Sequence, residues 1–217
     1  MSIGEFKMNL SVPEQRDLFA FFARVFGGEV DATFVDGLRG LGDDAPAELD
    51  EFLTRSKDLE TSEVVRSLNA DYARLFRSMS KNPVPPYESA LVGELPLLMQ
   101  EQRDRALAAY REFGYAVSED GRSQEDHVAL ECGFCGLLCE IEQMAGGEEG
   151  EGARAREARR AFVANHLAQW APVFAREVTA QEARHAKAGG HGLMFYSACA
   201  EMLVTFVDSL LDDKPLA

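Results

Sequence analysis

The chain has 217 residues, of which 46% are hydrophobic and 27% charged, and its formal net charge at pH 7 is −15. This length and apolar content exclude a disordered protein and predict one sizeable core, so a single domain over residues 1–217 is expected. The negative charge argues against nucleic-acid binding, which needs a basic surface, and it would attract a basic partner.

The chain shows no secretory or membrane-spanning segment. Its first residues, MSIGEFKMNL, lack the basic start and the apolar run of a secretory signal, and residues 1–9 are expected to form a loose tail. The most apolar window, 192–211, contains Glu201 and Asp208, so it predicts a buried core helix. We therefore expect a cytoplasmic protein with reduced cysteines.

The N-terminal part of the chain is predicted to be helical, because apolar residues recur at steps of three and four. Ser11 and Glu14 form a capping box ahead of a helix that Gly27-Gly28 can stop. Two short helices are predicted near 32–41 and 46–57, and a longer one at 61–76. The predicted apolar face of this longer helix consists of Val65, Leu68, Tyr72, Leu75 and Met79.

A stiff segment, NPVPPYESALVGELP, interrupts this pattern from Asn82 to Pro96. Prolines fix the backbone angle φ and favour an extended conformation, so the three prolines at 83, 85 and 86 predict a rigid, non-helical loop. Such a loop either merely connects helices or holds Tyr87 and Ser89 in fixed places beside them.

Helical spacing resumes after the loop. A helix through Leu95, Leu98 and Met99 is predicted to reach Phe113, with Gly114 as its stop. The next helix, near 125–145, has two apolar stripes, which predict a central helix with neighbours on two sides. Gly133 and Gly136 on this helix would permit close helix approach.

The C-terminal part begins with a flexible, charged loop at 146–152, which is also a candidate hinge for a domain-swapped dimer. A helix is predicted from about Ala153 to Trp170, where Pro172 should end or kink it. The last core helix is predicted at about 190–211. No segment alternates like a strand, so we predict an all-α, compact helical bundle, as a monomer or homodimer.

Two clusters carry potential chemistry. Cys132, Cys135 and Cys139 share one helical face, where packing in the core is favoured over a metal or redox site, because zinc normally takes four ligands. Asp126-His127 follows Ser123, a predicted N-cap, and the acids Glu125 and Asp126 suit a first helical turn. The alternative for this second cluster is a polar recognition site in a cleft. Phosphate-loop, dinucleotide, metalloprotease and catalytic-triad patterns do not occur, so no cofactor is predicted.

Several motifs occur in an order that resembles the TorD/DmsD family of redox-enzyme maturation chaperones. These are NADYARLF (69–76), PPYES (85–89), EDH (125–127), NHLAQWAPVF (165–174) and the final FYSACAEML. The chain departs from the family at Gln124, where proline is usual, and at Tyr87, where tryptophan is frequent. These departures leave open which protein, the client, such a chaperone would bind.

The resemblance implies an all-helical cytoplasmic chaperone, not an enzyme. Such chaperones bind the twin-arginine signal peptide, and often the body, of a molybdopterin oxidoreductase subunit, and hold it for cofactor insertion before export. Some members bind guanine nucleotides weakly, but without a phosphate-binding loop no such binding is predicted here. The stable partners expected are this subunit and its peptide, with no nucleic acid and no membrane insertion.

A twin-arginine peptide is a basic pair followed by an apolar stretch, which needs acids for the guanidinium groups and an apolar groove. We hypothesise that Glu125 and Asp126 supply charge, that the segment at Pro86 and Tyr87 supplies apolar surface together with Tyr72 and Phe76, and that Ser89 and His127 shape the floor. Tyr72 and Phe76 also fit an ordinary core stripe. Two alternatives stay open: a metal or redox protein using the three clustered cysteines, and an assembly chaperone for a nitrate-reductase-type subunit that is not exported.

Overall fold

The computed structural model describes residues 10–77, 82–93, 100–117, 124–146, 149–187 and 192–212. Every regular element among them is helical, so the all-α prediction is confirmed. The elements are α1 (Val12–Gly27), α2 (Ala32–Gly40), η1 (Gly42–Asp44), η2 (Ala47–Leu49), α3 (Asp50–Ser56), α4 (Thr61–Phe76), α5 (Glu88–Val92), α6 (Glu101–Glu112), α7 (Val128–Ala145), α8 (Glu151–Phe162), η3 (Val163–Leu167), α9 (Ala168–Lys187) and α10 (Phe195–Asp212).

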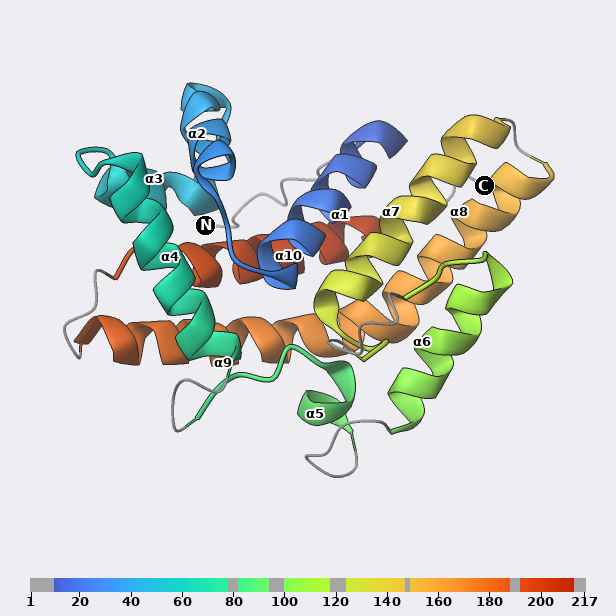
Figure 1. Cartoon of the computed structure of the whole chain (residues 1–217). Helices are drawn as coiled ribbons and strands as arrows, with labels where there is room; N and C mark the ends of the chain where they lie inside the picture. Colours follow the sequence, from blue (N-terminus) through green and yellow to red (C-terminus); the bar gives the residue numbers. More distant parts are fainter. Residues whose placement is uncertain are drawn as a thin grey trace, which may run out of the picture.

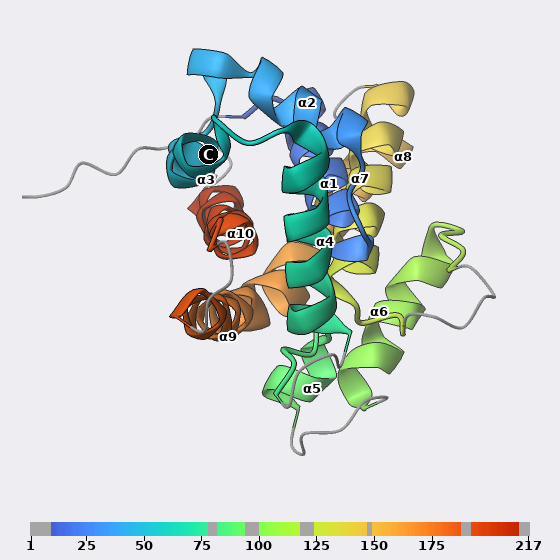
Figure 2. The same cartoon turned by 60° about the vertical axis from the view of Figure 1, so that its left-hand side comes forward.

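The helices pack into a bundle around α7. Helix α1 lies along one side of α7 and α8 along another, while α9 and α10 form a second closely packed pair (Figure 1). The prediction of a central helix with neighbours on two sides is thereby confirmed. Figure 2 shows α5 and α6 at one end of the molecule and α2 and α3 at the other.

Local signals account for several helix ends. The capping box of α1 is present, because Glu14 accepts hydrogen bonds from the backbone N–H and the hydroxyl of Ser11 at 2.7 and 2.6 Å. Helix α4 has the predicted bounds, although its buried face uses Val64 and leaves Val65 half-buried. Gly114 adopts a φ of 67° just after α6, as expected for a helix stop. Met79, Leu95, Leu98 and Met99 lie outside the described residues.

The prediction that Pro172 ends the helix was wrong, because α9 continues through it, whereas the alternative of a kink stays a prediction. A proline removes one N–H and crowds the carbonyl one turn earlier. That carbonyl belongs to Ala168, directly after the wide π turn of η3, where the N–H of Ala168 already bonds Val163. The regular hydrogen-bond ladder is therefore interrupted just upstream, and the helix accommodates the proline without ending.

The two glycines of α7 differ in their surroundings. A side chain at Gly133 would collide with the hydroxyl of Tyr115, which lies in the connection after α6. A side chain at Gly136 would meet Phe19 of α1 at an ordinary 3.8 Å. The predicted close approach therefore occurs at Gly133, against the side chain of a connecting segment instead of a helix.

Candidate functional site

The proline segment is joined to the head of α7 by backbone pairing. Tyr87 and His127 form an isolated antiparallel bridge. The N–H of Glu88 donates to the carbonyl of Asp126, and the N–H of Val128 donates to the carbonyl of Pro86, both at 3.0 Å. The loop is also tied to the end of α4, because the N–H of Val84 donates to Leu75 at 2.7 Å. The segment therefore holds Tyr87 in place, as one of the two sequence interpretations required. The prediction that the whole segment is non-helical was wrong, because α5 forms at Glu88–Val92, directly after the prolines.

Asp126 caps the short helix α5 from a distant part of the chain. Its side chain is fully buried, and its Oδ2 accepts the N–H of Ser89, in the first turn of α5, at 2.9 Å. The prediction that Glu125 and Asp126 occupy the first turn of the next helix was wrong, because α7 begins only at Val128. Ser123 lies outside the described residues.

His127 is the N-cap of α7. Its Nδ1 accepts the N–H of Ala129 at 3.1 Å, and its ring stands edge-on to Tyr87 with centroids 5.0 Å apart. Burial lowers the pKa of His127 to about 4. The imidazole is therefore neutral at pH 7, and it adds no charge beside Tyr87.

Glu125 is half-buried and paired with an arginine of α6. Arg103 holds its carboxylate with two bonds, Nε to Oε2 at 2.6 Å and Nη2 to Oε1 at 3.0 Å. This pairing lowers the pKa of Glu125. The hydroxyl of Tyr110 donates to the backbone carbonyl of the same residue at 2.7 Å. A second guanidinium would have to compete with Arg103 for this carboxylate.

The two α4 aromatics lie in and beside the core. Tyr72 is buried and its hydroxyl donates to the carbonyl of Phe26 at 3.2 Å, while Phe76 is half-buried. Their ring centroids are 5.2 Å apart. Burial raises the pKa of Tyr72, with a smaller contribution from the nearby Tyr87. Tyr72 is thus mainly a core residue, while Phe76 and Tyr87 present partly accessible aromatic surface.

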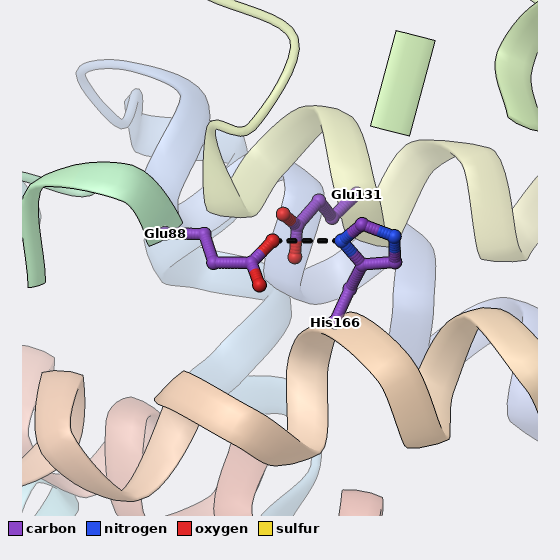
Figure 3. Close-up of side chains that lie close together, drawn as sticks. All are labelled: Glu88, Glu131 and His166. Atoms are coloured by element: carbon purple, nitrogen blue, oxygen red, sulfur yellow. Dashed lines mark hydrogen bonds and ion pairs between the residues drawn. The ribbon is translucent and has the colours of Figure 1, made fainter. Parts of the chain in front are cut away.

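A buried polar cluster beneath α5 was not predicted as part of the site. Oε2 of Glu88 in α5 and Nδ1 of His166 in η3 are joined by a hydrogen bond of 2.7 Å, and Glu131 of α7 lies beside them (Figure 3). Trp170 of α9 donates its Nε1–H to Glu131 at 2.9 Å. Glu88 lies in the motif PPYES, and His166 and Trp170 lie in NHLAQWAPVF. The signal available in the sequence was therefore the presence of polar residues within otherwise apolar helices.

This cluster ties four elements together, α5, α7, η3 and α9. All four residues are at most 5% exposed. Burial and, next, the negative Glu88 raise the pKa of Glu131 well above its ordinary value. A carboxyl kept protonated there can donate to a neighbouring carboxylate, so the cluster fastens α5 to α7 and η3.

Within the described part of the chain, the side chains of Glu88, Glu131 and His166 form a group that could hold a metal ion. One ligand atom each from Glu88, Glu131 and His166 lies within 4.8 Å of the other two. Two carboxylates and an imidazole suit a divalent ion such as zinc. Glu88 and His166 already hydrogen-bond to each other, and Glu131 accepts from Trp170. The cluster can therefore link its helices without a metal ion.

We predict that Glu131→Gln stabilises the protein more at pH 8 than at pH 5. A carboxyl whose folded pKa is raised contributes stability that is present below its unfolded pKa and is lost as pH rises toward the folded pKa, by up to about 1.4 kcal/mol per pH unit. Glutamine cannot ionise, and its amide can still accept from Trp170. Urea unfolding at both pH values measures the effect. Glu140→Gln, at an exposed site on the same helix, is the control, and equal shifts in both variants would contradict the prediction.

The cysteines belong to the core. Cys132, Cys135, Cys139 and Cys199 are buried and free. Burial raises the pKa of Cys132 and Cys135 well above the usual value and that of Cys139 to about 11. The thiolate form that binds metals is therefore disfavoured. The core-packing interpretation fits these surroundings better than the metal alternative.

Comparison with known proteins places the chain in a family. The family described as nitrate reductase delta subunit matches residues 41–176. The chaperone protein TorD of Photobacterium profundum is 30% identical over 183 residues, which cover 83% of this chain and 79% of that protein. The chain belongs to the TorD family.

Other similar proteins also carry the name of a chaperone. The chaperone protein TorD of Vibrio parahaemolyticus is 29% identical over 178 residues, covering 78% of this chain and 75% of that protein. The selenate reductase assembly chaperone protein of Thauera selenatis is 36% identical over 84 residues, covering 38% of this chain and 43% of that protein. This TorD-family member is accordingly a chaperone, not an enzyme.

Solved structures and the membrane-spanning potential of the helices were also considered for this chain. No solved structure matches the chain to significance. Within the described part of the chain, none of the helices combines the length and the apolar character needed to cross a membrane.

Proposed function

We propose that this protein is a cytoplasmic maturation chaperone for a molybdopterin oxidoreductase subunit. It binds the twin-arginine leader of that subunit, or its apo form, and holds it for cofactor insertion before export. The names of the TorD and selenate reductase relatives support an assembly role with such enzymes. The negative net charge of −15 suits a client segment that carries a basic pair.

The client-contact surface in this proposal is centred on Tyr87. The observation that carries it is the pairing of the Tyr87 segment with the head of α7, which orders this surface before a client arrives. Tyr87 and Phe76 offer half-buried aromatic area, and Glu125 offers a carboxylate that a client arginine could share with Arg103. The remaining proposed residues hold this surface in shape from below: Tyr72, Pro86, Ser89, Asp126 and His127.

Calorimetric titration of the purified protein with a synthetic twin-arginine leader tests the proposal. Tyr87→Ala should weaken binding by about tenfold, since an aromatic anchor at a contact surface is worth about 1–2 kcal/mol or more. Asp126→Ala should also weaken it, because α5 loses its cap and Ser89 moves. Asp126→Asn keeps an acceptor for the N–H of Ser89 and serves as the matched variant.

Circular dichroism must show native helix content in each variant. Unchanged affinity in both alanine variants would remove these residues from the site. The affinity for the leader should also fall as salt rises, because part of the attraction is between charges.

The match to the nitrate reductase delta subunit family favours a second candidate client, a reductase subunit that is not exported. In that case the chaperone would bind the N-terminus of a cytoplasmic subunit. Pull-down from the native host followed by mass spectrometry distinguishes the two. Recovery of a subunit with a twin-arginine leader supports the first candidate, and recovery of one without a leader supports the second.

A further inference from the structure

An apolar groove lies along the first half of α1, whose other end, at Gly27, approaches Ala129 at the head of α7 near the Tyr87 surface. It is an open groove of about 440 Å³ between α1, α2, the η1–η2 turn and α10. Its floor is apolar and includes Leu18, Phe21 and Phe206. Leu41, one of the few large apolar side chains that are exposed in the described chain, stands at its edge with 40% of its surface accessible. A volume in the range of about 300–1,000 Å³ is typical of ligand sites.

The rim of this groove is acidic. Glu14, Asp17, Asp44 and Glu48 line it, and its described lining includes no lysine or arginine. Asp17 pairs with the neighbouring Arg16 at 2.7 Å and Glu14 caps α1. Asp44 and Glu48 form no ion pair with any described residue. An apolar floor below unneutralised acids fits a segment that is apolar and carries basic residues beside the apolar run.

The hollow beside the proline segment has the opposite character. Its volume is about 330 Å³, and Arg176 and Arg184 line it together with the single acid Glu177. A basic client segment would be repelled there and attracted to the groove of α1. The charge distribution therefore distinguishes the two hollows.

We propose that the groove between α1, α2 and α10 binds the apolar run of the client's twin-arginine leader, with a basic residue that follows this run at the acidic rim, while the Arg-Arg pair stays at Glu125 on the Tyr87 surface. This inference rests on the proposed function and adds a second contact surface to it. Helix α1 has 16 residues and spans about 24 Å at 1.5 Å per residue. Roughly eight extended residues cover that distance, so one leader is long enough to reach both the groove and the Tyr87 surface.

The test is a calorimetric titration of the full-length protein with a synthetic leader that holds an Arg-Arg pair, about 12 apolar residues and then one lysine. Leu41→Asp should weaken binding by about fivefold or more, because it places a charge on the apolar edge. The double variant Asp44→Lys with Glu48→Lys should weaken it by about tenfold at low salt and less at high salt.

Matched controls carry the same chemical changes outside the groove. Met144→Asp alters another exposed apolar side chain, 88% accessible, at the end of α7. The double variant Asp58→Lys with Glu157→Lys makes the same change in net charge at two exposed acids that do not line the groove. Both controls should bind the leader within about threefold of the unchanged protein, because surface charges outside the contact are largely screened.

The outcomes separate the two proposals. Loss of affinity in the groove variants but not in the controls supports the groove as the docking site. Unchanged affinity in the groove variants, with loss in Tyr87→Ala, overturns the groove and leaves the proposed function standing. No binding by the unchanged protein overturns both. A dimer in sedimentation that Leu41→Asp converts to monomer would show that a second copy covers the groove, which also overturns the proposal.

Discussion

Replacing His166 with alanine is expected to lower the free energy of unfolding by about 3 kcal/mol, the upper end of the usual cost of leaving a buried polar group without its hydrogen-bond partner. Nδ1 of His166 lies 2.7 Å from Oε2 of Glu88, and their side chains are only 6% and 2% exposed. The substitution leaves the Glu88 carboxyl without its partner in the core. It also removes the stacking of His166 on Phe162, whose ring centroid is 4.4 Å away.

Urea unfolding followed by circular dichroism measures this loss. His185→Ala is the matched control, because His185 is only half-buried and contacts Gln181 on its own helix. It should cost at most about 1 kcal/mol. The double variant Glu88→Gln with His166→Ala should recover part of the loss, since no buried charge is then left unpaired. A loss no larger than that of His185→Ala would show that the Glu88–His166 contact contributes little.

The same substitution has a functional consequence. Glu88 is the first residue of α5, so the Glu88–His166 contact anchors the helix that follows Tyr87. A loosened α5 would leave Tyr87 less ordered before the client binds. We therefore expect His166→Ala to reduce leader affinity even at temperatures where the fold persists.

Acidification is expected to remove about 3 kcal/mol of stability through His127 alone. Its pKa is about 4 in the folded protein against an ordinary value of 6.5, and each pKa unit corresponds to about 1.4 kcal/mol. Because the folded pKa is depressed, the unfolded state takes up the proton first. The contribution of His127 is therefore fully present above pH 6.5 and is lost as pH falls from 6.5 to about 4.

His127→Asn isolates this effect from that of the carboxylates. Asparagine is a good N-cap and can accept the N–H of Ala129, but it does not titrate. Its stability should fall less than that of the unchanged protein between pH 7 and pH 4, by up to about 3 kcal/mol. Parallel stability curves for the two proteins, obtained by urea unfolding across this range, would contradict the burial of a neutral imidazole at this position.

The helices themselves could be predicted from the sequence, because their signals are local. The capping box of Ser11 and Glu14, the apolar spacing of α4 and the stop at Gly114 each depend on residues within one or two turns. These features predicted the all-α class and most helix positions. The family motifs also pointed correctly to a chaperone of the TorD family.

The roles of the site residues depended on contacts between distant segments. Asp126 was expected to carry charge for a client, yet it is buried as the cap of α5, 37 residues away from its partner Ser89. Glu125 was expected to be available, yet Arg103 holds it. Helical periodicity indicates which face of a helix is buried, but not which polar group it will meet there.

The sequence by itself determined a bundle of amphipathic helices, a stiff proline loop and a strongly negative surface, since these follow from composition and from spacing within each segment. Only the tertiary structure decided that Glu88 meets His166 across 78 residues and that acids from α1 and the η1–η2 turn surround one apolar groove. Contacts between residues this far apart in the sequence are set by how whole helices pack. A helix buries its apolar face in many geometries, and the geometry adopted depends on all the other helices at once.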